Sequence, residues 1–302
     1  MSSAAEAAAA GAVRTSFESG RSTRIWELAF KGCLVSCILV SLLVLVVLLE
    51  QILNDGIGSL SLGFLTDTPS RIDPASSGIG PALTGTLWLM LVCTVFIIPV
   101  GVATAVYLEE YADSDRWFNR VIEVNIQNLA AVPSIVYGVL GLAFLVRGPL
   151  SMGHVLLAGG LTLGLLVLPV LIVAGREAIR AVPASIREGS MALGATRWQT
   201  VWKQVLPASL PGIATGAILS LSRAIGETAP LIVIGAAAFA TSSPTGIFDD
   251  VTALPIQIFS WISDPQPEFK SLAAAGIIVL MVILLAMNAV AIWLRNRYEK
   301  KW

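Results

Sequence analysis

The feature that most constrains this chain is a series of long apolar segments with few charges. A helix needs about 20 apolar residues to cross the hydrocarbon core of a bilayer. Six candidate spans are present, at residues 27–53, 82–108, 122–146, 154–174, 208–240 and 272–294. Charged residues make up only 13% of the chain, about half of the fraction typical of soluble domains. The sequence therefore predicts an all-α integral membrane protein with six transmembrane helices.

Lysine and arginine are distributed unequally between the two sides of these spans. If the N-terminus is cytoplasmic, 15 of the 19 basic residues lie in cytoplasmic segments and 3 in external loops, and Arg223 lies inside the fifth span. Because basic loops tend to stay in the cytoplasm, we expect both termini there. The cytoplasmic set is Arg14, Arg21, Arg24, Lys31, Arg116, Arg120, Arg176, Arg180, Arg187, Arg197, Lys203, Arg295, Arg297, Lys300 and Lys301; the external set is Arg71, Arg147 and Lys270.

The remaining composition predicts the domain organisation and excludes several site classes. Residues 1–26 are rich in Ala and Ser and are predicted to be a disordered tail; residues 27–302 are predicted to form one transmembrane domain. The first apolar run is too long for a signal peptide, and no small-residue cleavage site follows it. The cysteines lie in apolar runs and the single histidine, His154, is expected at an interface, so no metal site is predicted. The net charge of −1 gives no reason to expect a nucleic-acid partner.

Two short patterns suggest how the spans pack. Gly160 with Gly164, and Gly212 with Gly216, have the four-residue spacing that lets membrane helices approach closely. The external segment 253–261, ALPIQIFSW, is apolar but too short to span. We expect it to form an interfacial helix or a surface for docking a partner.

The segment 175–207 is longer than an ordinary connection and has the pattern of two short helices. Pro183 can begin the first helix, and Gly194 permits a left-handed stop. Arg187 and Glu188 are expected to face water, beside a small apolar patch. In the second helix Trp198, Val201, Trp202 and Val205 are expected on one face, as in an amphipathic helix at the lipid interface. Leu206 and Pro207 are expected to turn the chain into the fifth span.

This segment resembles the EAA loop of the permeases of binding-protein-dependent ABC importers. That loop reads Glu-Ala-Ala, three residues, Gly, nine residues, Ile, one residue, Leu-Pro. The matching positions are Glu188, Gly194, Leu206 and Pro207; the departures are Gly189 and Ser190 for the two alanines, and Gln204 for the isoleucine. The resemblance implies a coupling helix that sits in a cleft of an ATPase subunit. No lysine here follows a glycine, so the chain lacks a Walker A loop and ATP and Mg²⁺ would be bound by that partner, with no cofactor on this chain.

Further segments resemble the phosphate-specific permeases of this family, in particular the PstA type. They are IGPALTGTLWL (79–89), PVGVATAVYLEEYA (99–112), NLAAVPSIVYGVLGLAF (128–144), LSRAIGETAPLIV (221–233) and LPIQIFSW (254–261). The resemblance implies a type I importer fold, with a five-span core preceded by one peripheral N-terminal span, in a prokaryotic plasma membrane. It also implies a non-catalytic subunit whose partners are a second permease (PstC-like), an ATPase dimer (PstB-like) and an external phosphate-binding protein (PstS-like), besides lipid.

Two charges inside the fifth span are the first candidates for a transport site. Arg223 and Glu227 lie far from either end of the segment, where charge is costly to place in lipid. Pro230 and Gly226 are predicted to break the helix beside them, which is tolerated where the backbone lines a cavity. Two hypotheses remain open. The residues form a buried pair that fixes helix register, or Arg223 makes a transient forked contact with phosphate while Glu227 limits its affinity.

The third span contains a second proline, which also suggests a pathway. Pro133 leaves the carbonyl of Leu129 without its helical partner and predicts a kink. Ser134 and Tyr137 are then candidates to line a polar path, although Ser134 could equally bond its own helix. Other classes that fit the sequence less well are a permease for another oxyanion or solute, and an ATP-independent channel or secondary transporter, which would not need the 33-residue segment.

Overall fold

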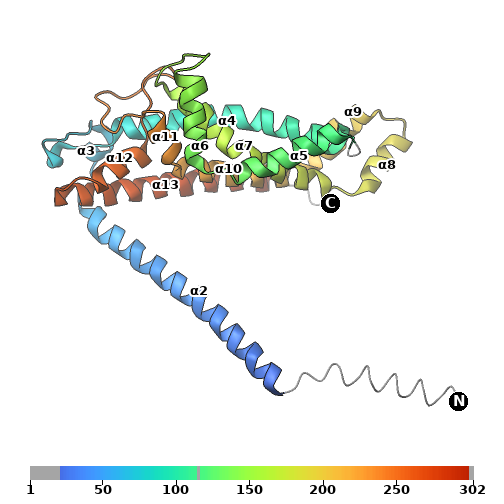
Figure 1. Ribbon diagram of the computed structural model, residues 1–302, viewed down its shortest axis with the longest axis horizontal. Helices are drawn as coiled ribbons and strands as arrows, with labels where there is room; N and C mark the ends of the chain where they lie inside the picture. Colours follow the sequence, from blue (N-terminus) through green and yellow to red (C-terminus); the bar gives the residue numbers. More distant parts are fainter. Residues whose placement is uncertain (1–20, 114–115, 299–302) are drawn as a thin grey trace. The chain divides into compact units, whose positions relative to one another are not determined.

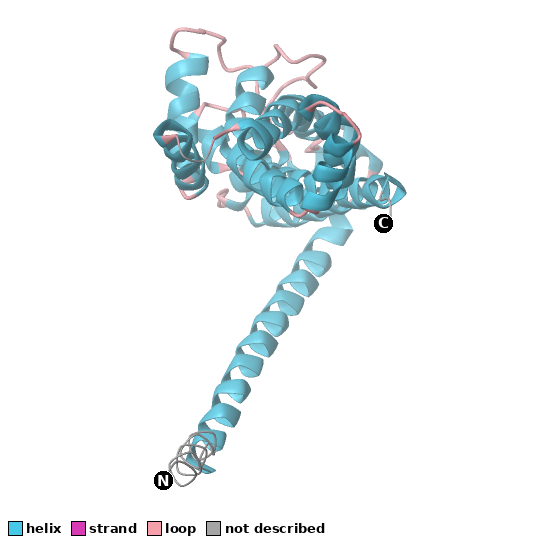
Figure 2. Ribbon diagram, turned by 90° about the vertical axis from the view of Figure 1, so that its right-hand side faces the viewer, coloured by secondary structure: helices cyan, strands magenta, loops and turns pink. Residues whose placement is uncertain are grey.

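The computed structural model describes residues 21–113 and 116–298. In these ranges it consists of helices joined by loops (Figure 2), with one isolated bridge between Val155 and Asp250. The contacts divide the chain into two units, residues 1–54 and 55–302. The predicted disordered tail at 1–26 lies mostly outside the described residues. In the first unit, helix α2 (Arg21–Gly56) begins and contains the first predicted span.

The second unit is a helical bundle in which four long helices run side by side (Figure 1). They are α4 (Gly80–Val106), α7 (Leu156–Arg180), α10 (Leu206–Gly226) and α13 (Pro267–Tyr298). Five helices in the described chain are long and apolar enough to cross a membrane, or six if one bent pair counts as a span. The predicted all-α membrane fold is therefore confirmed.

Small residues allow α7 to pack closely against both of its main neighbours. A Cβ atom at Gly160 would lie 2.6 Å from Val92 of α4, and one at Gly216 would lie 2.6 Å from the Cβ of Ala174. A Cβ at Gly164 would likewise lie 2.6 Å from the ring of Phe96, and one at Gly212 would lie 2.5 Å from the Cβ of Ala178. The prediction from glycine spacing is confirmed, and it places α7 at the centre of the bundle between α4 and α10.

The third predicted span is broken by more than a right angle. Helix α5 (Trp117–Ala130) ends before Pro133, and α6 (Ser134–Leu140) continues into a π-helical turn, η4 (Gly141–Val146). The two segments are bent by 109°. The kink expected at Pro133 is thus a full break, because proline disfavours helical geometry in the residue before it and cannot donate an amide hydrogen.

The second half of the 175–207 segment differs from prediction. Helix α9 (Arg197–Thr200) passes through a π-helical turn, η5 (Val201–Val205), directly into α10. The expectation that Leu206 and Pro207 turn the chain is wrong. Pro207 is accommodated in a continuous helix because the preceding turn is widened: the Leu206 amide donates to the carbonyl of Val201, five residues back.

The prediction of one apolar face in the second helix of this segment is also wrong. Val201 and Val205 are buried whereas Trp198 and Trp202 are exposed, so the four residues do not share one face; the widened turn shifts their angular spacing. The segment ALPIQIFSW forms α12 (Leu254–Ile262), which packs inside the bundle against α13 and α4. Trp261 is fully buried whereas Phe259 and Ile262 are exposed, so one face of this helix joins the core and its role at an interface or a docking surface stays a prediction.

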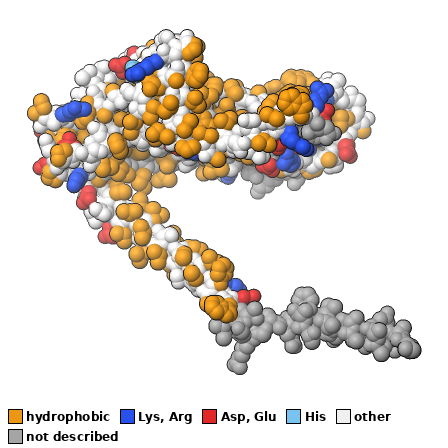
Figure 3. Space-filling model, viewed as in Figure 1, with side chains coloured by type: hydrophobic (Ala, Val, Ile, Leu, Met, Phe, Trp, Pro, Cys, Tyr) orange, Lys and Arg blue, Asp and Glu red, His pale blue; other side chains and the backbone are white. Residues whose placement is uncertain are grey.

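The shorter elements lie at the two ends of the bundle. One end carries η1 (Ile57–Ser59), α3 (Leu62–Thr66), η2 (Pro74–Ser76) and the loop that precedes α12. In that loop, hydrogen bonds from the amides of Thr245 and Gly246 lower the pKa of Asp249. The other end carries η3 (Tyr107–Tyr111), α5, α8 (Ala184–Ala192) and α9. Figure 3 shows charged side chains gathered toward the ends, with hydrophobic side chains over the middle.

Candidate functional site

The helix break predicted in the fifth span is present and holds two charged side chains. Helix α10 ends at Gly226, Glu227 is extended (φ −80°, ψ 113°), and α11 (Ala229–Val233) begins with Pro230 in its first turn. The Nε of Arg223 donates to Glu227 Oε1 at 3.2 Å. The Arg223 side chain is 39% exposed and that of Glu227 20% exposed. The pairing is therefore confirmed, and it is an open pair rather than an enclosed one.

The structure brings the two broken spans together at Pro230. Helices α6 and α11 pack against each other at Gly138, where an added Cβ would lie 2.7 Å from the Cα of Pro230. At Gly226, by contrast, a Cβ would meet nothing within 4 Å. The break between α10 and α11 thus rests on α6 on one side and has open space on the other.

Tyr137 makes a contact across the break at Pro133. Its hydroxyl donates to the carbonyl of Leu129 at 2.9 Å, and this carbonyl also accepts from the amide of Val132 at 3.2 Å. The ring is buried, and Arg223 lies close enough for its charge to act on this group. Ser134 is half-buried and its hydroxyl has no hydrogen bond among the described residues. The expectation that Ser134 bonds its own helix is therefore not met, since it stands at the first position of α6.

The candidate coupling segment centres on α8. Gly194 has φ +87° and ends the helix in the left-handed conformation, as predicted. The hydroxyls of Ser190 and Thr200 lie 3.0 Å apart and join α8 to the last residue of α9. Glu188 and Gly189 are exposed, and no group lies within 4 Å of a Cβ built at Gly189. Leu193 is 91% exposed, so the tip of this segment presents both a free carboxylate and an apolar side chain.

Leu206 and Pro207 link this segment to the transport candidate. They occupy the first turn of α10, the helix that ends at Gly226 beside Arg223. The described chain is helical without interruption from Arg197 to Gly226. A displacement at one end of this rod can therefore be passed to the other.

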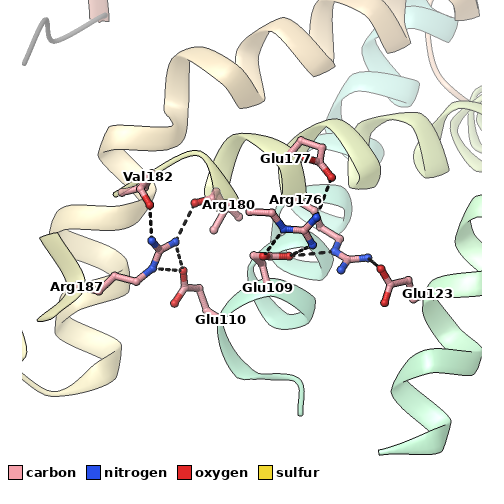
Figure 4. A network of polar contacts seen from close by, with 9 residues as sticks. Glu109, Glu110, Glu123, Arg176, Glu177, Arg180, Val182 and Arg187 are labelled. Carbon is pink, nitrogen blue, oxygen red and sulfur yellow. Dashed lines mark hydrogen bonds and ion pairs between the residues drawn. The ribbon is translucent and has the colours of Figure 1, made fainter. Parts of the chain in front are cut away.

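A network of ion pairs fixes α8 to the rest of the bundle, and the sequence did not predict it (Figure 4). Arg176 of α7 bonds Glu109 of η3 and Glu123 of α5, at 3.4 Å and 2.9 Å. Arg180 also bonds Glu109, at 2.9 Å, and the exposed Glu177 at 3.2 Å. Three segments, η3, α5 and α7, thus meet at one end of the bundle.

Arg187 makes the most enclosed contacts of this network. Its guanidinium donates to Glu110 Oε1 at 2.7 Å and 2.9 Å, to the carbonyl of Val182 at 2.6 Å and to that of Ile179 at 2.8 Å. The Glu110 side chain is only 8% exposed. The prediction that Arg187 faces water is wrong, because it caps the carboxyl end of α7 and neutralises a buried acid.

One sequence signal could have revealed the network. The acids of YLEEY end the second span and the bases of GREAIR end the fourth, so topology places them at the same side of the membrane. Opposite charges at equal depth on neighbouring helices favour pairing. The sequence does not specify which acid pairs with which arginine.

Comparison with known proteins is consistent with this arrangement. Residues 97–301 match the family model described as "Binding-protein-dependent transport system inner membrane component". The chain is 32% identical over 279 residues to the probable ABC transporter permease protein YqgI of Bacillus subtilis, covering 88% of this chain and 93% of YqgI. It is 34% identical over 221 residues to the phosphate transport system permease protein PstA 1 of Mycobacterium tuberculosis, covering 73% and 71%.

A solved structure supports the fold alone. A bacterial alginate ABC transporter in complex with an alginate pentasaccharide-bound periplasmic protein matches with a TM-score of 0.63 and 15% identity, over 92% of this chain and 99% of the compared chain. The predicted importer-permease fold is confirmed by this likeness together with the family match. The chain belongs to the family of binding-protein-dependent transport system inner membrane components, a family of multi-pass, non-catalytic membrane subunits.

Proposed function

We propose that this chain is a permease subunit of an ATP-driven importer for inorganic phosphate in a prokaryotic plasma membrane. The observation that carries the proposal is the 34% identity to a phosphate transport permease over a range that covers 73% of the chain. In this assignment the chain forms half of the translocation path and pairs with a second, PstC-like permease. A PstS-like external protein delivers the phosphate.

In this proposal α8 is the element that meets a PstB-like ATPase dimer, which binds the ATP and Mg²⁺. Glu188, Gly189 and Leu193 are exposed at its tip, where a partner can reach them. Ser190 and Gly194 set the shape of the tip, through the contact with Thr200 and the left-handed turn. The enclosed Arg187 holds the base of α8 against α7 and η3. Motion of the ATPase would then move α8, and through the continuous helix it would move α10.

The proposed contact with phosphate is Arg223. Among the described residues its guanidinium has one hydrogen bond, to Glu227, which leaves other donors for an anion, and arginine presents a planar fork that suits phosphate. The open space at Gly226 adjoins it. Glu227 pairs with Arg223 when no anion is present, and its negative charge lowers the affinity of the site for a bound anion. Pro230 and Tyr137 fix the two helix breaks beside this pair.

The solute is tested with the assembled complex in liposomes. Radiolabelled phosphate should accumulate only when ATP and the binding protein are both supplied, and an excess of unlabelled sulfate or molybdate should not compete. Uptake of sulfate or molybdate in place of phosphate would assign the chain to another oxyanion. Uptake of phosphate without ATP would indicate a channel or secondary transporter.

The coupling role is tested by reversing the exposed charge on α8. Glu188→Lys should separate ATP hydrolysis from uptake or release the ATPase, with no loss of thermal stability because the side chain has no ion pair among the described residues. The matched control is Glu268→Lys, an exposed glutamate at the start of α13, which should leave both activities unchanged. Unchanged assembly, hydrolysis and uptake in Glu188→Lys would show that α8 does not couple as proposed.

A further inference from the structure

Helices α10 and α13 are joined by two polar contacts between side chains. The Ser222 hydroxyl donates to Asn288 Oδ1 at 2.7 Å. Seven residues earlier in α10, Thr215 Oγ1 accepts from Arg295 Nη1 at 3.2 Å, and Arg295 lies seven residues after Asn288 in α13. The two helices therefore run antiparallel and side by side (Figure 1). Seven residues make nearly two helical turns, so both contacts lie on one face of each helix, about 10 Å apart.

Apolar packing alone does not fix how α13 is set against α10. Every side chain of α13 from residue 277 to residue 293 is half-buried or exposed. Lipid chains are as apolar as these side chains, so a slip of α13 along α10 exchanges one apolar contact for another. A polar side chain in the same position loses its hydrogen bond when the helix slips or rotates, and that loss is unfavourable in hydrocarbon. The two polar contacts therefore set the register of the pair.

The contact of α10 with α7 is of a different kind. Gly212 and Gly216 bring that face of α10 close to Ala178 and Ala174. Ser220, four residues beyond Gly216, continues the same face. Its side chain is fully buried, and its hydroxyl has no hydrogen-bond partner among the described residues. In the described chain, close packing of small residues thus joins α10 to α7, whereas hydrogen bonds between side chains join it to α13.

We propose that Asn288 is a positioning residue for the transport site. Its partner Ser222 directly precedes Arg223 in α10, so the bond between Ser222 and Asn288 fixes the rotation of α10 and with it the direction of Arg223. Together with the contact of Thr215 and Arg295, two turns nearer the coupling segment, it makes α10 and α13 move as one unit. This inference rests on the proposed function, in which α10 carries the motion of the ATPase, and it adds α13 to the moving part.

The register is tested without reference to transport. Spin labels at Leu219 of α10 and Val282 of α13, both exposed, report the distance between the helices in a full-length chain whose exposed cysteines are replaced by serine. Ser222→Ala should widen the distribution of distances, because α10 can rotate against α13 once the bond is lost. Ser220→Ala is the matched control, since it removes a hydroxyl from the same helix that has no partner among the described residues, and it should keep the wild-type width. Equal widths in the two variants would overturn the proposal.

The effect on transport is measured as solute taken up per ATP hydrolysed by the assembled complex in liposomes. Ser222→Ala and Asn288→Ala should each lower this ratio about threefold, the effect of one hydrogen bond between membrane helices, and the double variant should lower it no further. Ser222→Thr keeps the hydroxyl and should retain the wild-type ratio, as should Ser220→Ala. A merely structural role would lower the amount of assembled complex and leave the ratio unchanged. An unchanged ratio in Ser222→Ala, or losses that multiply in the double variant, would therefore overturn the proposal.

Failure of this inference is distinguishable from failure of the proposed function. If the wild-type complex takes up another anion in place of phosphate, the proposed solute is wrong, and the same ratio is measured with that anion. If uptake needs no ATP, the proposed coupling is wrong, and α10 and α13 do not form a unit that an ATPase moves. The widths of the spin-label distances decide in either case whether Ser222 and Asn288 set the register.

Discussion

Two arginine–glutamate pairs in this molecule have opposite surroundings. Arg187 and Glu110 are joined at 2.7 Å in an enclosed site, and the guanidinium is further bonded to two backbone carbonyls. Arg223 and Glu227 share one contact of 3.2 Å, and the arginine side chain is 39% exposed. In the first pair almost all of the N–H donors of Arg187 are bonded. In the second pair Arg223 has N–H donors without a partner among the described residues.

The difference shows which pair can change partner during a transport cycle. Breaking the enclosed pair leaves a charge without compensation in a site that water reaches poorly, so it is expected to stay intact while α8 moves as one piece with α7. The open pair loses little when it separates, because solvent or an anion can replace the missing carboxylate. The first pair is suited to transmitting motion and the second to meeting a solute.

The largest expected effect comes from removing the acid of the enclosed pair. Glu110→Ala leaves Arg187 without its carboxylate, and the free energy of unfolding should fall by about 3–5 kcal/mol. Thermal unfolding of the purified complex measures this as a lowered Tm. Glu177→Ala is the control, since that carboxylate is 64% exposed in its pair with Arg180 and should cost no more than about 1 kcal/mol. Equal losses from the two variants would remove the contrast between enclosed and open pairs.

The next effect should appear in transport and leave stability nearly unchanged. Arg223→Gln removes a charged donor, and a charged hydrogen bond contributes about 1.5–3 kcal/mol, so phosphate uptake should fall roughly tenfold to a hundredfold. The Tm should move little, because the pair is exposed. Arg223→Lys keeps the charge without the fork and should give intermediate uptake. Normal uptake by Arg223→Gln in an assembled complex would exclude a direct role for this arginine.

An exchange of the two charges separates pairing from recognition. In the double variant Arg223→Glu with Glu227→Arg, an ion pair remains possible but the arginine lies beyond the end of α10. Restored assembly without uptake would show that the position of the arginine matters beyond pairing. Restored assembly with full uptake would favour the hypothesis that the pair only fixes helix register.

The contrast between these pairs also indicates how far the sequence can be interpreted. Apolar length and glycine spacing predict the spans and the close packing of α7, because both depend on local pattern alone. The pair of Arg223 and Glu227 is predictable for the same reason, since its members are four residues apart. Arg187 and Glu110 are 77 residues apart, and α8 by itself has the polarity of a water-facing helix. The enclosure of the Arg187–Glu110 pair becomes visible only when the ends of α4 and α7 are placed together.

Prolines show a similar limit. The sequence marks Pro133, Pro207 and Pro230 as places where a helix is disturbed, yet the structure resolves them in three ways. Pro133 follows a break of 109°, Pro207 lies within a continuous helix after a widened turn, and Pro230 begins a new short helix. The outcome depends on which groups bond the carbonyl that the proline leaves without its i+4 partner. For Leu129 these groups are the amide of Val132 and the hydroxyl of Tyr137, which belongs to the next helix.

The smallest expected effect tests the hydroxyl contact of Tyr137. Tyr137→Phe keeps the buried ring and removes only the hydroxyl that bonds the Leu129 carbonyl, so the free energy of unfolding should fall by about 1 kcal/mol. Tyr107→Phe is the matched control, because its ring is half exposed and its hydroxyl has no hydrogen bond among the described residues; its Tm should not change. Uptake by Tyr137→Phe should follow the small loss of stability. A loss of uptake much larger than the change in Tm would instead place the hydroxyl on the solute path beside Arg223, where the open pair and the break at Pro133 would act as one site.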